Sequence, residues 1–469
     1  MGSLVSTCND DQNTYIKTLE INNMVPRTRR EALAAMALTA SAGCITTPFE
    51  ESKSIFDTRV SDGFPIAADT DEWALPHYDS GHTRYTPSEA APSGTDLHRH
   101  WRRPTPENTE RAAGLAVANG RCYTTFERYD RRQDTTSIGF HVVDADNGDV
   151  IWQQTMGEWQ SGFSPIYGPL PAVGAEMLWF GEISDGREQL TAVAASTGER
   201  QWSVPTSTMQ TAVPTGQLLH IGRRQPDGGD NDHEAVAVDP LSGEPVWETA
   251  LSNSPGYPAS DGTDLFYPIS DHGRDSPGQI VKLDPVTGEH CGAIDATVQS
   301  MPVVADGRLY SSGWASRRLV ALETETGSVA WERDVRFNHE FGDRGVNARY
   351  LFGGVTEERL IVLKHMHGIR SDELWALDPV TGDTVWEVIV DPSDPVTTFN
   401  RPLVAGSKLF VTGTESPKND TREGFVTVFD LGSGELLARQ KLPSACFMPP
   451  VVAAGRLFVV CQEDILAFS

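Results

Sequence analysis

Basic residues are scarce in this sequence: 38 Lys and Arg stand against 65 Asp and Glu, which gives a net charge of −27 over 469 residues. A charge of this sign argues against electrostatic binding to nucleic acid or to anionic lipid headgroups. The acidic residues are spread along the whole chain. We therefore interpret the charge as adaptation to concentrated salt, which screens repulsion between surface charges. An acidic face for a cationic partner is the alternative.

Cysteine is also rare, and the six cysteines are dispersed without an adjacent or Cys-x-x-Cys pair, which argues against a zinc site. We expect Cys446 and Cys461 to lie on neighbouring strands of one sheet, where they are able to form a disulfide if the protein is exported. Separate buried thiols are the alternative for these residues and for Cys122 and Cys291.

The apolar run nearest the N-terminus, Ala32 to Ala42, is too short to cross a bilayer as a helix. It follows a basic group that contains Arg29 and Arg30, and it ends in small residues, which is the three-part pattern of an export signal. The arginine pair resembles a twin-arginine signal. The residues Ser41-Ala42-Gly43-Cys44 resemble a lipobox, in which the cysteine is lipidated and becomes the mature first residue. A short amphipathic helix on a soluble protein is the alternative.

These features divide the chain into four segments. Residues 24–44 are the predicted export signal, with Cys44 as the lipidation site, and residues 1–23 are interpreted as a disordered upstream over-extension of the reading frame. Residues 45–70 are polar and contain no periodic pattern, as in a flexible tether. Residues 71–469 are predicted to fold as one domain, exported and held at the outer face of the cell membrane through the lipid alone.

The folded part is organised around a hairpin that occurs seven times. Its clearest copy runs from Leu374 to Trp386, with the turn Asp378-Pro379-Val380-Thr381-Gly382 between two strands. Proline pre-sets φ early in such a turn, and glycine takes the positive φ that ends it. The turn glycines are 39 to 55 residues apart: Gly148, Gly198, Gly243, Gly288, Gly327, Gly382 and Gly434.

A strand-only repeat with a period near 45 residues is typical of β-propeller blades, each a four-stranded sheet. The chain ends, from Met448 to Ser469, with the first three strands of a blade and no fourth. Near the start, Thr95 to Trp101 reads as a fourth strand without a blade. Joining the two completes an eighth blade and removes the exposed edges of an open array. The sequence therefore predicts an all-β fold, an eight-bladed β-propeller of antiparallel blades closed by an N-terminal strand, with seven blades as the alternative.

These hairpins and the entry segment Trp73 to Pro87 resemble the pyrroloquinoline-quinone-like β-propeller repeat family over residues 71–469. The resemblance implies two different functions. Some members are quinone-dependent alcohol and glucose dehydrogenases, whereas another is the lipoprotein subunit of the bacterial outer-membrane assembly machinery, an eight-bladed scaffold without catalysis.

The resemblance to the dehydrogenases does not extend to their site. Those enzymes hold the quinone near two adjacent cysteines, with calcium ligands and a catalytic aspartate, and this sequence has no adjacent cysteines and no calcium-loop spacing. Asp239, Asp284, Asp378 and Asp430 recur at one turn position, so we interpret them as turn caps. We therefore predict no catalytic residue, cofactor or metal, and a binding or scaffold module for protein partners, as a monomer or part of a membrane complex. A quinone-dependent dehydrogenase with an altered cofactor site is the alternative.

Function is expected where the repeat fails. The polar segments from Arg223 to His233, Asp271 to Gly278 and Thr414 to Gly424 are predicted loop tips that contact partners. The last contains a glycosylation sequon at Asn419. Four residues offer metal ligands, although solvated loop side chains are the simpler interpretation: His339, Glu340, His365 and His367. The first strand of each blade is predicted to line a central channel, either as a ligand site or as a wet polar wall, with these residues at its mouth: Thr211, Tyr257, Gln299, Asn347, Asn400, Arg401 and Phe447.

Overall fold

The structure is a computed structural model. It describes residues 72–86, 90–107, 109, 111–130, 133, 135–160, 170–174, 176–184, 187–206, 212–215, 217–224, 232–269, 278–296, 301–313, 318–334, 348–366, 372–389, 396–416 and 422–469. These residues belong to the second of two compact units of the chain, Phe56–Ser469.

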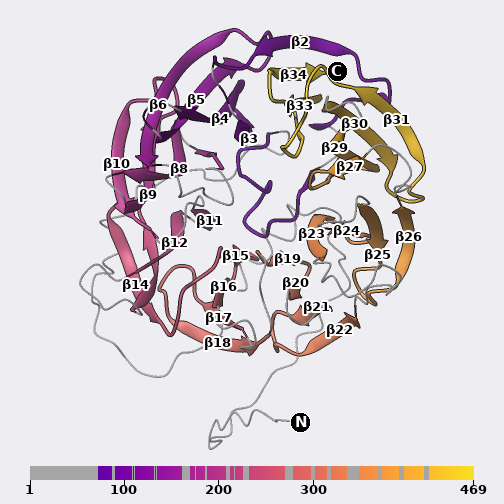
Figure 1. Cartoon of the computed structure of the whole chain (residues 1–469). Coiled ribbons are helices and arrows are strands. Elements are labelled where there is room, and N and C mark those ends of the chain that lie inside the picture. The colour runs from indigo at the N-terminus through magenta and orange to yellow at the C-terminus, as the bar shows by residue number, and fades with distance from the viewer. Residues whose placement is uncertain are drawn as a thin grey trace, which may run out of the picture. The chain divides into compact units, whose positions relative to one another are not determined.

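All regular elements of the described residues are strands, and they form eight antiparallel four-stranded blades arranged in a ring (Figure 1). In each blade the four strands, A to D, run from the inside of the ring to its rim. This confirms the predicted eight-bladed propeller.

Blade 1 consists of β3 (Arg111–Ala118), β4 (Arg121–Asp130), β5 (Thr135–Asp144) and β6 (Val150–Gln160), and blade 2 consists of β7 (Ala172–Gly174), β8 (Met177–Ser184), β9 (Arg187–Ala194) and β10 (Arg200–Pro205). Blade 3 consists of β11 (Val213–Thr215), β12 (Leu218–Arg224), β13 (His233–Val238) and β14 (Pro245–Leu251), and blade 4 consists of β15 (Ala259–Ser260), β16 (Leu265–Ile269), β17 (Gln279–Leu283) and β18 (His290–Asp295).

Blade 5 consists of β19 (Val303–Ala305), β20 (Arg308–Gly313), β21 (Arg318–Glu323) and β22 (Val329–Asp334), and blade 6 consists of β23 (Ala348–Val355), β24 (Leu360–Met366), β25 (Glu373–Leu377) and β26 (Thr384–Ile389). Blade 7 consists of β28 (Leu403–Ala405), β29 (Lys408–Ser416), β30 (Glu423–Asp430) and β31 (Leu436–Lys441), and the short strands β1 (Tyr85–Thr86) and β27 (Val396–Phe399) pair with it. Blade 8 consists of β32 (Val451–Ala453), β33 (Arg456–Val460), β34 (Asp464–Phe468) and β2 (Arg99–Pro104).

The two ends of the chain close the ring in blade 8, as predicted. Strand β2 pairs antiparallel with β34. The backbones of His98 and Ser469 exchange two hydrogen bonds of 3.0 and 2.9 Å. The guanidinium of Arg102 donates to both carboxylate oxygens of the buried Asp464, at 2.5 and 2.9 Å. Such a two-pronged pair fixes the register of the closing strand.

The repeated turns have the predicted geometry. Gly382 has a φ of 75°, and the other six turn glycines have φ between 69° and 76°. Asp378 caps its turn: one carboxylate oxygen accepts the backbone N–H groups of Val380 and Thr381 at 2.7 and 2.9 Å. Asp239 and Asp284 cap their turns in the same way. The aspartates are therefore explained by local geometry.

The recurring tryptophans join neighbouring blades. The ring of Trp331 in blade 5 lies against Gly382 in the turn of blade 6, where an added Cβ would stand 2.7 Å from it. The indole N–H of Trp331 donates to the carbonyl of Pro379 at 3.0 Å. The arrangement recurs around the ring in the pairs Trp101–Gly148, Trp152–Gly198, Trp202–Gly243, Trp247–Gly288 and Trp386–Gly434.

Two blades lack this tryptophan. Ala438 stands in its place in blade 7, and the next blade has no C–D turn to receive it, because strands C and D of blade 8 come from opposite ends of the chain. In blade 4 the place is taken by Gly292, and the side chain of Ile294 contacts the turn glycine Gly327 instead. The junction between blades 4 and 5 therefore lacks the indole hydrogen bond of its neighbours.

Replacing Trp331 with alanine will destabilise the protein by about 3–5 kcal/mol, the usual cost of removing a buried aromatic side chain. The side chain is buried, and the substitution also removes one of the two donors to the Pro379 carbonyl, the other being the hydroxyl of Tyr310 at 3.2 Å. Urea unfolding measures the loss. The control is Val329→Ala on the same strand, where the side chain is exposed and the expected change is within about 0.5 kcal/mol. Equal effects of both substitutions would contradict the interpretation of Trp331 as a junction residue.

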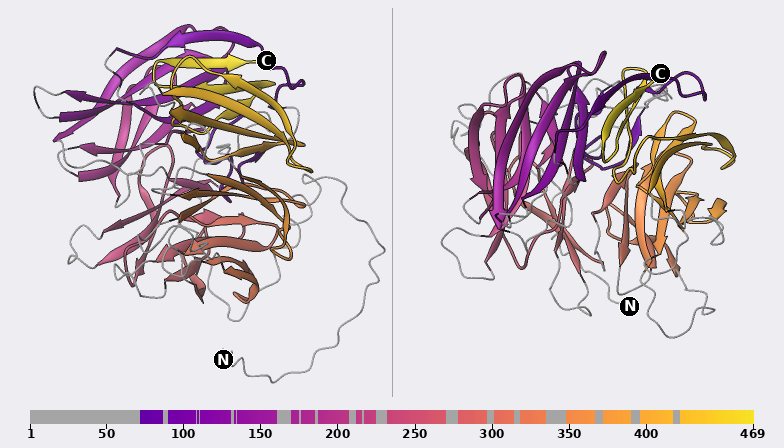
Figure 2. Two further views of the ribbon diagram at one scale, coloured as in Figure 1. Left: turned by 45° about the vertical axis from the view of Figure 1, so that its right-hand side comes forward. Right: turned by 45° about the horizontal axis from the view of Figure 1, so that its top comes forward.

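The ring has two different ends, because consecutive strands of a blade run in opposite directions. Figure 2 shows the blades from two further directions. The short A–B and C–D turns lie at one end, which we call the turn face. The B–C and D–A connections lie at the other, which we call the loop face. The strands that flank the predicted loop tips end at the loop face, and the tips are narrower than predicted: Arg223 and His233 are buried strand residues, and Thr414 and Gly424 lie in β29 and β30. Asp271 to 277 and Asn419 lie outside the described residues.

Candidate functional site

The entry segment lies inside the ring and contacts one blade after another (Figure 1). We call residues Trp73–Thr86 the belt. Trp73 exchanges backbone hydrogen bonds with Val117 of blade 1. The belt carbonyls then accept N–H groups from the inner strands of blades 2, 4, 5, 6 and 7, in the order Ala74 from Val173, Ser80 from Ser260, Gly81 from Val304, Thr83 from Val355 and Arg84 from Val404. The hydroxyl of Ser80 donates to Pro214 of blade 3. The belt therefore links blades 1 to 7, and Ala90, beyond it, reaches blade 8 through Gly455.

The belt is tightly held and has unusual backbone geometry. A Cβ at Gly81 would collide with the carbonyl oxygen of Val304, so only glycine fits at this contact. Tyr78, His82 and Arg84 have φ of 79°, 61° and 48°, a region that non-glycine residues rarely adopt. Three such residues in seven positions indicate that the surrounding ring imposes this conformation, as happens at functional sites.

The belt corrects the predicted channel wall. Strand A is the innermost strand of each blade, but the belt covers the wall along the path described above. Tyr257 is buried rather than at an open mouth, and its ring stacks on His82 with centroids 4.9 Å apart. Asn400 and Arg401 are half-buried, and Phe447 is 40% exposed on the loop face. Thr211, Gln299 and Asn347 lie outside the described residues. The resemblance of the entry segment to the repeat family is the sequence signal that set this stretch apart from a linker.

A cluster of basic side chains occupies the centre of the ring. Arg84 donates from Nε to the carbonyl of Pro402 at 2.8 Å and from Nη1 to Nδ1 of His77 at 3.2 Å. Because a guanidinium only donates, Nδ1 of His77 accepts, and this histidine is neutral. His82 donates from Nδ1 to the carbonyl of Pro302 at 3.0 Å. Burial, with a further contribution from Arg401, lowers the pKa of His82 to about 3. Burial and the neighbouring basic groups lower the pKa of His77 as well.

Of the four candidate metal ligands only His365 lies among the described residues, and its partner is an aspartate. Nδ1 of His365, in β24, lies 2.8 Å from a carboxylate oxygen of Asp372, whose second oxygen accepts the backbone N–H of Phe399 at 2.7 Å. This contact ties blade 6 to blade 7. His339, Glu340 and His367 lie outside the described residues. The described residues contain no group of three or more His, Cys, Asp or Glu side chains that could hold a metal.

The two cysteines whose pairing was left open form a disulfide, Cys446–Cys461. Both residues are buried, and the bond ties the connection that enters blade 8 to the end of β33. Cys122 is buried as a free thiol, and Cys291 is an exposed free thiol.

Replacing Cys446 and Cys461 with alanine will lower stability by about 3 kcal/mol, because the bond closes a loop with a sequence separation of 15 residues. Thermal unfolding measures the loss. Peptide mapping without reduction checks the bond, with Cys291 as the internal standard for a thiol that alkylates in the native protein. Alkylation of Cys446 and Cys461 in the unfolded, unreduced protein would contradict the pairing.

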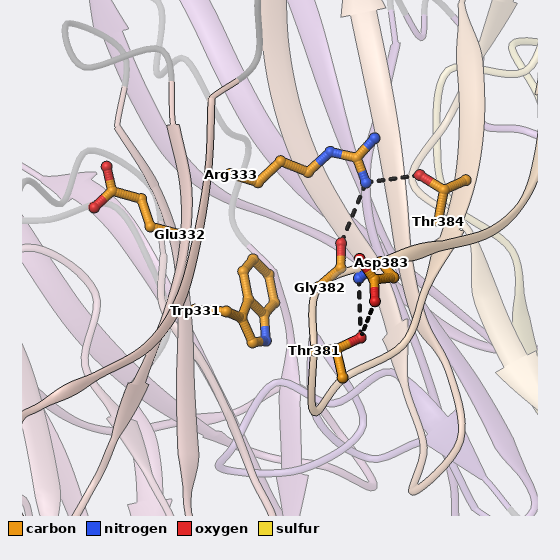
Figure 3. A pocket seen from close by; sticks show the side chains of 7 residues that line it. All are labelled: Trp331, Glu332, Arg333, Thr381, Gly382, Asp383 and Thr384. Atoms are coloured by element: carbon orange, nitrogen blue, oxygen red, sulfur yellow. Dashed lines mark hydrogen bonds between the residues drawn. The ribbon is translucent and has the colours of Figure 1, made fainter.

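A shallow pocket of about 320 Å³ lies where blade 5 meets blade 6 (Figure 3). Trp331 and Gly382 form part of its lining. Arg333 donates to the carbonyl of Gly382 at 3.2 Å and to the hydroxyl of Thr384 at 2.7 Å. The polar groups that line the pocket thus hold blades 5 and 6 together, and we interpret the pocket as part of the junction between these two blades.

The comparisons with known proteins now identify the family. The family model for outer membrane protein assembly factor BamB matches residues 89–274, 276–414 and 370–468. The chain belongs to the BamB family. The crystal structure of BamB from Moraxella catarrhalis is similar with a TM-score of 0.50 at 15% identity, over 80% of this chain and 98% of that one.

Quinohemoprotein alcohol dehydrogenases share the fold with this BamB-family chain. The ADH-IIG enzyme of Pseudomonas putida is 28% identical over 145 residues, which are 30% of this chain and 19% of the enzyme. The match thus spans about a fifth of the length of that relative. The structure of ADHIIG from Pseudomonas putida HK5 has a TM-score of 0.58 at 15% identity, over 86% of this chain and 80% of that one. At this identity the structural likeness shows the fold alone.

The described residues do not fit the quinone of those enzymes. The centre of the ring holds His77, His82 and Tyr257 with ring centroids 4.9 to 6.3 Å apart. The disulfide joins residues 15 positions apart rather than neighbours.

The predicted export signal and lipidation site lie outside the described residues, with their residues Arg29, Arg30 and Cys44. In the part of the chain that the structure describes, no helix is long and apolar enough to cross a membrane.

Proposed function

We propose that this chain is an exported, lipid-anchored propeller without catalytic activity, which binds protein partners through its loop face at the outer side of the cell membrane. The observation that carries the proposal is the match to the BamB family over the whole ring. The resemblance of Ser41-Ala42-Gly43-Cys44 to a lipobox supports the anchor.

The difference between the two faces supports the choice of the loop face. On the turn face, Asp378 and its counterparts are engaged in capping their own turns. The B–C and D–A connections, whose lengths vary from blade to blade, begin and end at the loop face. There Phe447 is 40% exposed, and the guanidinium of Arg422 lies 5.9 Å from the centre of its ring. Exposed aromatic and arginine side chains are enriched where proteins bind each other.

Co-purification from native membranes tests the proposal. Phe447→Ser and Arg422→Ser are expected to lower the amount of the partner that co-purifies by about tenfold or more, the effect of losing an interface anchor worth about 2 kcal/mol. The matched control is Val380→Ser on the turn face, where an apolar side chain 53% exposed is removed without loss of the partner. Equal recovery with all three variants would contradict binding at the loop face.

The anchor has its own test. Mass spectrometry of the native protein is expected to find Cys44 as a lipidated first residue, and Cys44→Ser is expected to move the protein from the membrane to the soluble fraction. An unmodified Cys44 inside a longer chain would contradict anchoring and leave the loop-face test unaffected.

One observation favours a second function, a quinone-dependent dehydrogenase with an altered site: the curated relative matched over 145 residues is such an enzyme. Adding pyrroloquinoline quinone and Ca²⁺ to the purified protein would then give a new absorbance band and dye-linked alcohol oxidation. We expect neither, because the described residues at the centre of the ring do not fit the quinone.

A further inference from the structure

Within the described part of the chain, Arg84 carries a buried donor without an acceptor at the centre of the ring. It is 2% exposed. Its Nε and Nη1 groups donate to the Pro402 carbonyl and to His77, and a longer contact of 3.4 Å reaches the Pro76 carbonyl. Its Nη2 group is buried and has no hydrogen-bond partner among the residues that the structure describes. A buried charged donor without an acceptor costs more than a neutral one, so its retention calls for an acceptor.

The charge around Arg84 is positive, although the whole chain carries −27. Arg401, two residues before the inner strand β28 of blade 7, is close enough to act electrostatically on Arg84, His77 and His82. None of the ion pairs among the described residues includes Arg84. Trp73 offers only the face of its ring, with its centroid 5.4 Å from the guanidinium carbon. A guanidinium keeps its proton in proteins, so this charge is not removed by titration at neutral pH.

The orientation of these side chains gives the side of approach. Belt carbonyls bond to Val304 and Val404 within the inner strands, whereas His82 and Arg84 donate to Pro302 and Pro402, two residues nearer the loop face. Both side chains therefore point from the belt toward the loop end of the channel. A ligand reaches them from the loop face, because the belt backbone lies on the other side.

We propose that Arg84 and Arg401 bind a small oxyanion, a phosphate or a carboxylate group, at the centre of the ring. The fork of a guanidinium matches the two oxygens of such a group, and hydrogen bonds of this kind are charge-assisted. The neutral His77 and His82 hold the site in shape: His77 accepts from Arg84, and His82 is fixed by Pro302 and by stacking on Tyr257. The site is separate from partner binding at the rim of the loop face and does not depend on it.

Thermal unfolding of the whole exported chain tests the site with three probes at equal ionic strength: sodium phosphate, sodium acetate and sodium chloride. Saturation at about 100 times the dissociation constant stabilises a protein enough to raise the unfolding temperature by about 3 °C or more. We expect this rise over chloride with at least one oxyanion. A rise with phosphate alone identifies a tetrahedral anion, and a rise with acetate alone identifies a carboxylate. No rise with either oxyanion overturns the proposal.

Two variants and a matched control assign the effect to the site. Arg84→Gln and Arg401→Gln are expected to abolish the rise, and Arg401→Gln carries the test if Arg84→Gln does not fold. Arg318→Gln keeps it, because Arg318 is half-exposed and pairs with Glu332 and Asp334 of β22. An equal rise in the wild type and in the folded variants at Arg84 or Arg401 would mean that the anion acts elsewhere and would overturn the assignment.

Discussion

A chain that begins at Thr105 will fail to form a stable propeller, whereas a chain that begins at Phe56 will fold like the whole protein. The shorter chain lacks both β2 and the belt. Without β2, blade 8 loses its outer strand, the Arg102–Asp464 pair and the docking of Trp101 on Gly148. Without the belt, blades 1 to 7 lose the backbone segment that links them. The combined loss exceeds the typical free energy of unfolding of about 5–15 kcal/mol.

Circular dichroism and urea unfolding of both truncated chains measure this effect. The chain from Phe56 is the matched control, because it keeps the whole second compact unit. A cooperative transition of the Thr105 chain at the same urea concentration as the control would show that neither β2 nor the belt holds the ring together. A single substitution in the same closing strand, Trp101→Ala, is expected to lower the free energy of unfolding by about 3–5 kcal/mol.

Acidification will destabilise the propeller steeply below about pH 6.5. Burial lowers the pKa of His82 to about 3 and the pKa values of His141 and His220 to about 4, and it lowers the pKa of His77. In the unfolded chain these groups take up protons near pH 6.5, so the unfolded state binds more protons below that pH. Stability is therefore full above pH 6.5 and is lost as the pH falls towards the folded pKa values.

The expected loss of stability can be calculated, because a difference of one pKa unit between the folded and unfolded states corresponds to about 1.4 kcal/mol. At pH 5 the free energy of unfolding falls by about 2 kcal/mol for each of the three histidines His82, His141 and His220, which together remove much of the stability of a typical domain. Urea unfolding at pH 7.5, 6.5, 5.5 and 5.0 in high salt measures the slope, since salt screens the repulsion among the acidic surface groups. His220→Phe should reduce the slope by about one proton. Stability that is constant from pH 7.5 to 5.0 would contradict the neutral buried state of these side chains.

The fold was predictable because its chemistry repeats. Each hairpin carries its own glycine and, in most blades, its own capping aspartate and tryptophan, so seven local patterns give seven of the blades without long-range information. The eighth blade followed from Trp101, which carries the pattern of a fourth strand without the other three. The sequence alone did not explain why blades 4 and 7 lack the tryptophan, whereas the structure shows what stands at these two junctions instead.

The belt and its basic cluster were not predictable in this way. Arg84 meets Pro402 across 318 positions, and His82 meets Pro302 across 220, and no period relates these residues. Only the family resemblance of the entry segment distinguished the belt from an ordinary linker. The loop boundaries were set too wide at Arg223 because its polar side chain suggested exposure, whereas in the structure it is buried against Glu234 at 2.5 Å. A paired charge inside a strand has no sequence signature of its own.

The central claim is that protein partners bind this ring at its loop face. Site-specific photo-crosslinking in native membranes tests it most directly, with the crosslinking side chain placed at Phe447 on the loop face or at Val380 on the turn face. Both positions are exposed, at 40% and 53%, so each is able to report a bound neighbour. The account predicts a discrete crosslinked product from position 447 and none from position 380. Products from position 380 alone, or from neither position, would contradict it.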